Sequence, residues 1–163
     1  MENKTLRGGA VLLLAEALLR KATLKKELDA LKQRMGESAR VPHDEEPVDD
    51  YIALLDIYHK KESELMELSL RILSTNNSAA FKDGETIAQA IIRRDSLKRT
   101  VSMYSKLLSA ATGGSRGLFS SRDVKYKRVV DMDKARANMD SAAMQYRDLD
   151  VKLQQMNWNT ELL

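Results

Sequence analysis

The stretch Leu14–Lys26, with the sequence LAEALLRKATLKK, returns 73 residues later as Ile87–Arg99, with the sequence IAQAIIRRDSLKR. Five of these thirteen positions are identical, and most of the others keep their size and polarity. A second, shorter repeat with a different offset relates Glu67–Ile72 to Asp148–Leu153. Because neither copy can bury its apolar positions alone, the duplication predicts two similar helical hairpins packed on one another.

Length and composition favour a single domain over residues 1–163, built from long helices. The chain is 31% charged and 5% aromatic, with two prolines and seven glycines, a usage typical of helical rather than sheet proteins. It has no cysteine, which excludes disulfides, thiol nucleophiles and thiolate metal sites and suits a cytoplasmic location.

Apolar residues at alternating spacings of three and four define four helical seams. They predict helices over residues 10–35, 47–77, 87–112 and 132–156, the first ending at Gly36. The hairpins 10–78 and 86–159 then form an all-α fold, either an antiparallel four-helix bundle or a coiled-coil-like pair of duplicated hairpins. Thr86 and Gln89 predict a capping box, and Asp83-Gly84 predicts a turn. We expect Trp158 to dock on the fold, since an exposed Trp is costly.

The two hairpin loops carry opposite charge. Residues 37–50 hold six acids and one arginine, whereas residues 115–128 hold five cations and one acid. Val124 and Tyr126 are β-prone, so a short two-stranded ribbon with Arg40-Val41 at the hairpin loops is an expected addition to the helices. We expect the two loops to neutralise each other, within one chain or between chains.

The basic loop is also a candidate for binding a polyanion or a partner. Cations interleaved with aromatic side chains are the mixture that single-stranded nucleic-acid binders use. Pairing with the acidic loop is favoured over nucleic acid because no established RNA-binding motif accompanies it. The candidate residues are Arg116, Arg122, Lys125, Tyr126, Lys127 and Arg128.

Lys21 and Arg94 occupy equivalent positions of the repeat, each on an apolar seam. Burying a cation without a partner costs several kcal/mol of folding free energy. We therefore expect ion pairs with acids on neighbouring helices, or side chains that snorkel to water. An anion pocket near a pseudo-symmetry axis is the alternative. As a third option, these charges set helix register or oligomeric state.

The sequence contains little that is typical of a catalytic or metal-binding site. His43 and His59 lie in unrelated settings, and neither belongs to the Glu-x-x-His motif of a four-helix di-metal site. No nucleophile elbow, phosphate loop or dinucleotide fingerprint is present. We therefore expect a protein that is not an enzyme and takes no cofactor.

Several short motifs, in order along the chain, resemble the septicolysin-like family of small bacterial helical proteins. They are LAEALL at 14–19, STNN at 74–77, DGETI at 83–87, RRD at 93–95, VKY at 124–126 and QMNWNTEL at 155–162. The resemblance implies a bacterial origin and helical hairpins, and it supplies no active site. The membrane-active cytolysin that the name suggests is disfavoured, because the apolar run at 10–15 is too short for a signal peptide and no stretch approaches the roughly 20 apolar residues of a membrane span.

Together these patterns favour a cytoplasmic scaffold or interaction protein that self-associates. Long apolar seams and complementary loop charges indicate a homo-oligomer formed through helical faces or charged loops. Nucleic-acid binding through the basic loop is the runner-up.

Overall fold

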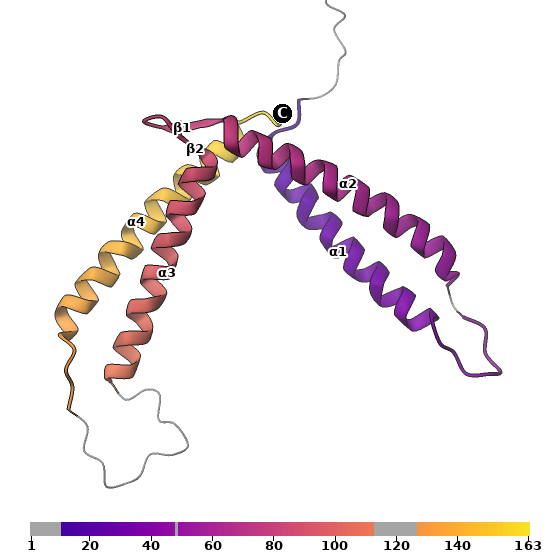
Figure 1. The fold of residues 1–163 in the computed structure, drawn as a ribbon, viewed down its shortest axis with the longest axis horizontal. Coiled ribbons are helices and arrows are strands. Elements are labelled where there is room, and N and C mark those ends of the chain that lie inside the picture. The colour runs from indigo at the N-terminus through magenta and orange to yellow at the C-terminus, as the bar shows by residue number, and fades with distance from the viewer. Residues whose placement is uncertain (1–10, 48, 113–126) are drawn as a thin grey trace, which may run out of the picture. The chain divides into compact units, whose positions relative to one another are not determined.

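Four α-helices and a two-stranded ribbon make up the described part of the chain, residues 11–47, 49–112 and 127–163 of a computed structural model (Figure 1). The elements in order are α1 (Leu14–Ser38), α2 (Tyr51–Ser78), β1 (Ala80–Lys82), β2 (Glu85–Thr86), α3 (Ile87–Ala111) and α4 (Met132–Asn159). The predicted all-α class is therefore confirmed. The coiled-coil-like and oligomeric descriptions stay predictions.

The helices of the two repeats match in length and order. Helices α1 and α3 both have 25 residues and start 73 residues apart, whereas α2 and α4 both have 28 residues and start 81 residues apart. Every helical position of the first hairpin thus has one repeat-equivalent position in the second. This correspondence allows the two hairpins to be compared side chain by side chain.

By internal contacts the chain divides into two units. The first consists of Met1–Ala80 with Met156–Leu163, and the second is Phe81–Gln155. In the first unit α1 and α2 run antiparallel, side by side (Figure 1). In the second, a hydrogen bond from the Asn138 amide to the Tyr104 hydroxyl, at 3.3 Å, joins α4 to α3.

The seam of the first unit is filled by large aliphatic side chains. Those that are buried are Leu14, Leu24, Leu28, Leu31, Leu54, Leu68, Ile72 and Leu162. The seam of the second unit has fewer buried large aliphatic side chains, and Ala135 stands where the first unit has Leu54. Its buried side chains are Ile87, Ala90, Ala135, Ala142, Leu149 and Leu153.

The first two helices begin and end later than the sequence pattern predicts. Helix α1 begins at Leu14, because Leu12 pairs with the C-terminal segment through a 2.8 Å bond from the Leu162 N–H to its carbonyl. It then runs past Gly36 to Ser38, with the Gln33 side chain bonded to that of Glu37. Helix α2 begins at Tyr51 rather than near Pro47. The Asp50 carboxylate caps it by accepting the Ile52 N–H at 2.9 Å.

The ribbon lies between α2 and α3, not at the hairpin loops. Its turn, Asp83-Gly84, has positive φ at both residues, the geometry of a tight two-residue hairpin. Thr86 and Gln89 then form the expected capping box. Arg40 and Val41 take part in no strand, and the expected partners Val124 and Tyr126 lie outside the described residues.

The C-terminal segment docks on the first unit, but not through its Trp. Trp158 is 53% exposed, whereas Leu162 is buried. The Leu163 N–H donates to the Thr75 hydroxyl at 3.0 Å, and the Arg71 guanidinium donates to the Leu163 carbonyl at 2.7 Å. The expected Trp anchor was wrong because the buried Leu162 and two hydrogen bonds between α2 side chains and the Leu163 backbone hold this segment.

Candidate functional site

Arg94 is an ion-paired cation on the seam of the second hairpin. Its guanidinium lies 2.8 Å from the Asp95 carboxylate and 3.4 Å from that of Asp150 on α4. Partial burial by itself lowers the pKa of Arg94, but the hydrogen bond to Asp95 and the charges of both acids outweigh this and raise it. The expected interhelical ion pair is thus present at this position.

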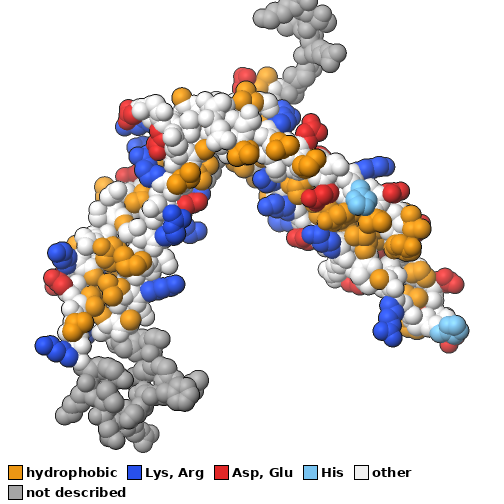
Figure 2. Space-filling view, in the orientation of Figure 1, with side chains coloured by type: hydrophobic (Ala, Val, Ile, Leu, Met, Phe, Trp, Pro, Cys, Tyr) orange, Lys and Arg blue, Asp and Glu red, His pale blue; other side chains and the backbone are white. Residues whose placement is uncertain are grey.

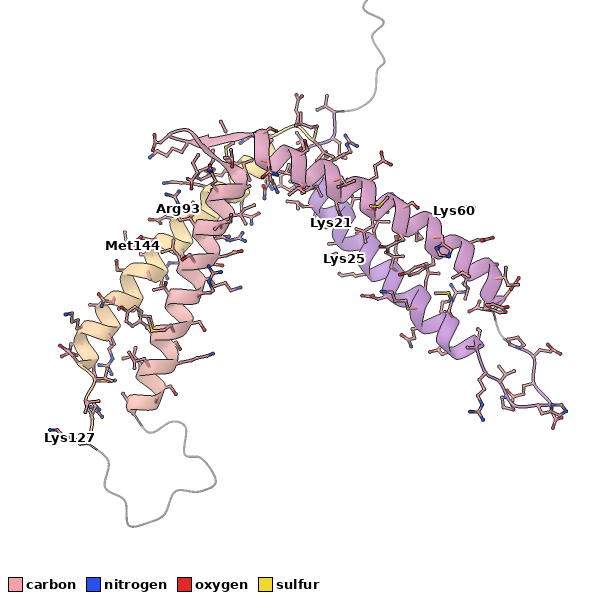
Figure 3. The ribbon with its side chains drawn as sticks, in the orientation of Figure 1. Lys21, Lys25, Lys60, Arg93, Lys127 and Met144 are labelled. Carbon is pink, nitrogen blue, oxygen red and sulfur yellow. The ribbon has the colours of Figure 1, made fainter. Side chains whose placement is uncertain are left out.

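Lys21, the repeat-equivalent of Arg94, has a different environment. It is half-buried on α1, one turn from the exposed Lys25 on the same side of the helix (Figure 3). No ion pair to Lys21 is found within the described residues. The repeat-equivalents of Asp95 and Asp150 are Ala22 and Ser69, so the two acids that neutralise Arg94 are absent here.

A stripe of exposed apolar side chains runs along α2, and the sequence reasoning missed it. The stripe consists of Ile52, Leu55, Met66, Leu70 and Leu73, each between 40% and 61% exposed. These positions share one helical face because the helix repeats every 3.6 residues. They lie off the buried seam of Leu54, Leu68 and Ile72. We call this face the α2 stripe.

The repeat-equivalent face of α4 is mostly polar. The residues that replace the five of the stripe are Asp133, Arg136, Arg147, Val151 and Gln154. A helix face in contact with water normally has this composition. The α2 stripe is therefore a departure from the duplicated plan, and a second three-and-four spacing outside the seam is the sequence signal that could have revealed it. Figure 2 shows hydrophobic side chains gathered along the visible face of the α1–α2 hairpin.

The second unit contains an open cavity of about 730 Å³ beside the ribbon. It lies against the Asp83-Gly84 turn, three turns of α3 and two turns of α4. Its lining includes Gln89, Arg93 and Leu97 from α3 and Gln145, Leu149 and Lys152 from α4. None of these residues was singled out from the sequence.

Of the candidate polyanion-binding residues, Lys127 and Arg128 fall within the described chain. Lys127 is exposed, and the Arg128 guanidinium donates to the Ala111 carbonyl at 3.2 Å. The other four, Arg116, Arg122, Lys125 and Tyr126, lie outside the described residues. The expected contact between the acidic and basic loops therefore stays a prediction.

The acidic loop is partly neutralised from within its own hairpin. The Arg34 guanidinium donates to Asp49 with an Nε–Oδ2 distance of 3.0 Å. This hydrogen bond and the charge of Arg34 hold the pKa of Asp49 below its ordinary value.

Residues 11–47, 49–112 and 127–163 contain no group of three or more His, Asp or Glu side chains placed so that it could hold a metal ion. Within the same residues, none of the helices has the length and apolar character that a bilayer span requires.

Comparison with known proteins places the chain in a family. Residues 21–162 match the model of a family of unknown function, DUF6847, and the chain belongs to that family. It is also similar to a crystal structure titled as a functionally unknown conserved protein from Corynebacterium diphtheriae. The two are 31% identical, with a TM-score of 0.86 over 94% of this chain and 99% of the other. No curated protein matches. Nothing in these findings supports the septicolysin-like assignment or a cytolysin.

Proposed function

We propose that this member of the DUF6847 family is a non-enzymatic helical scaffold that self-associates through the α2 stripe. The proposal goes beyond the comparisons, which establish a family of unknown function. One observation carries it: an exposed apolar stripe about six turns long whose spacing makes it complementary to itself.

The spacing of the stripe is the same in both directions along α2. The five stripe residues, taken together with the exposed His59 on the same face, are separated by steps of 3, 4, 7, 4 and 3 residues. If two copies of α2 pack antiparallel about a two-fold axis between Glu62 and Ser63, then Ile52 faces Leu73 of the other copy and Leu55 faces Leu70. An isologous contact needs such a self-complementary surface. This symmetry favours a second copy of the chain over an unrelated partner.

The contact should be specific but weak. Five half-exposed apolar side chains per copy give an interface below the roughly 1,200 Å² of a standard stable complex. We therefore expect a micromolar dimer in fast exchange. Sedimentation equilibrium between about 5 and 500 µM would measure it, and a monomer across that range would overturn the proposal.

Single cysteines test the register directly, because the native chain has none. The variants Leu55→Cys and Leu70→Cys, each alone, place the two thiols of a dimer about 15 residues apart along the helices, which is roughly 22 Å and beyond disulfide reach. Mixed together, they place Cys at facing positions. We expect a disulfide-linked dimer in the mixture and little in either variant alone. Equal cross-linking in all three samples would contradict the antiparallel register.

Nucleic-acid binding through the basic loop is the runner-up and stays a prediction. It requires affinity that falls steeply with salt and is lost when the five cations of residues 115–128 are neutralised. The exposure of Lys127 is compatible with it. Fluorescence anisotropy with single-stranded oligonucleotides at 50 and 200 mM salt measures both properties.

A further inference from the structure

The cavity of the second unit lies where the first unit has an interhelical ion pair. In the first unit the Arg20 guanidinium bridges from α1 to Glu64 on α2, with nitrogen–oxygen distances of 2.7 and 2.8 Å. The repeat-equivalents of these two residues are Arg93 and Gln145. Both line the cavity. The second unit has therefore kept the arginine and lost the carboxylate that bridges the helices.

Without that carboxylate, both side chains have local partners instead. One terminal nitrogen of Arg93 lies 2.8 Å from Glu85 in β2, just before α3. The Gln145 amide donates to the Ser141 hydroxyl one turn away at 3.3 Å. Neither contact crosses from α3 to α4, so the groove between the helices stays open at this level. Arg93 has further N–H donors beyond the one that faces Glu85.

The lining has an apolar floor and rims that carry both signs of charge, with Asp83, Glu85 and Asp148 beside Lys82, Arg93 and Lys152. Leu149 is buried and Leu97 half-buried beneath the groove, with Phe81 half-buried beside the turn. Lys82 lies 3.5 Å from Asp83 and is neutralised locally. Lys152 on α4 and Arg93 on α3 face the groove from opposite helices. The Arg93 guanidinium has N–H donors beyond the one that faces Glu85, so above this apolar floor it matches a ligand with one anionic end and a short hydrocarbon body.

We propose that this cavity binds the carboxylate of a small amphipathic molecule. The ligand's carboxylate takes the place that the Glu64 carboxylate holds in the first unit, between Arg93 and the α4 side of the groove, and its apolar body lies over Leu97 and Leu149. The volume falls within the range of small-molecule sites. Because the groove is open to water, we expect millimolar affinity for a simple carboxylate. This site is independent of the α2 stripe.

An NMR titration of the full chain with sodium hexanoate tests the proposal. We expect saturable shifts of the Arg93, Leu97, Gln145 and Lys152 amides. Hexanol and hexylammonium, which have the same body without the carboxylate, should give none. N-acetyl-leucine tests whether a peptide chain end is accepted as well as a free acid. Equal shifts with hexanol would reduce the site to apolar adsorption and overturn the proposal.

Two substitutions at one position sharpen the test. Gln145→Glu restores the residue of the first unit, so its carboxylate should draw Arg93 across the groove and weaken hexanoate binding at least tenfold. Gln145→Met is the matched control, similar in size but without charge, and should bind within about threefold of the native chain. Arg93→Gln should also lose at least tenfold. Unchanged binding by the Gln145→Glu variant would contradict the ion-pair replacement, and circular dichroism verifies that each variant folds.

Discussion

The two hairpins share one framework and differ on their surfaces. The buried positions Leu68 and Ile72 of the first correspond to the buried Leu149 and Leu153 of the second. The correspondence fails at three places: the α2 stripe against polar α4, the Arg20–Glu64 bridge against a cavity, and Lys21, with no ion pair among the described residues, against paired Arg94. The seam is what any such hairpin needs in order to fold. The departures from it are where a function specific to this chain can be sought, and each hairpin serves as the control for the other.

The largest difference between the hairpins should appear on removing an equivalent leucine from each seam. Leu24 is fully buried, whereas its repeat-equivalent Leu97 is half-buried beside the cavity. We expect Leu24→Ala to lower the free energy of unfolding by about 3 kcal/mol and Leu97→Ala by about 1 kcal/mol, because only the first leaves an enclosed void. Urea denaturation followed by circular dichroism measures both. Equal losses would mean that the two seams are equally well packed.

Converting the α2 stripe to its α4 counterpart should abolish self-association and leave folding intact. The double variant Leu55→Arg with Met66→Arg introduces the residues that α4 has at these positions. We expect its dimerisation to weaken more than tenfold, since each new arginine would have to be buried without a partner against the apolar surface of the other copy. Ile57→Arg, an apolar-to-arginine change on the same helix outside the stripe, should dimerise as the native chain does. Sedimentation equilibrium compares the three proteins at equal ionic strength.

Much of the framework could be predicted because it depends on local patterns. The repeat at Leu14 and Ile87 predicts paired hairpins, and the capping box of Thr86 needs only residues within one turn. Helix ends were less predictable where a distant side chain takes part. Arg34 binds Asp49, and Asp50 is then the cap, so α2 starts four residues after Pro47.

The candidate site was harder to predict, because its features are differences in surroundings rather than motifs. Lys21 and Arg94 look alike in sequence, and the acids around them separate the two: Asp95 beside Arg94 on α3 and Asp150 on α4. At the cavity, the second hairpin has Gln145 where the first has Glu64, and no single-helix pattern reveals this difference. The α2 stripe was present in the sequence but concealed by the stronger buried seam.

Exchanging the acids around Lys21 and Arg94 should change the free energy of unfolding by less than the loss of a buried leucine does. Asp150→Ser removes one of the two acids that pair with Arg94, and we expect it to cost about 1 kcal/mol. Ser69→Asp places an acid at the repeat-equivalent position near Lys21 and should stabilise the first hairpin by less than about 1 kcal/mol. Thermal unfolding at low and high salt distinguishes these electrostatic contributions from changes in packing, because salt screens both ion pairs. Destabilisation by Ser69→Asp would show that Lys21 is not close enough to benefit.

The smallest effect should be a pH dependence that belongs to the first hairpin alone. The Lys61 ammonium lies 2.7 Å from the Glu27 carboxylate, whereas the equivalent residues in the second hairpin, Ala142 and Thr100, cannot form such a pair. The hydrogen bond from Lys61 lowers the pKa of Glu27 below its ordinary value of 4.5. A carboxylate whose pKa is lower in the folded state binds protons more readily when unfolded. Its stabilisation is therefore fully present above about pH 5 and is lost as the pH falls through the lowered value.

We expect the Tm difference between the native chain and Glu27→Gln to be constant from pH 7 to 5 and to vanish toward pH 3. Glu67→Gln removes an exposed carboxylate of α2 with no ion pair among the described residues, and it should show no such convergence. If both variants converge alike on the native chain, the effect reflects net charge rather than the Glu27–Lys61 pair.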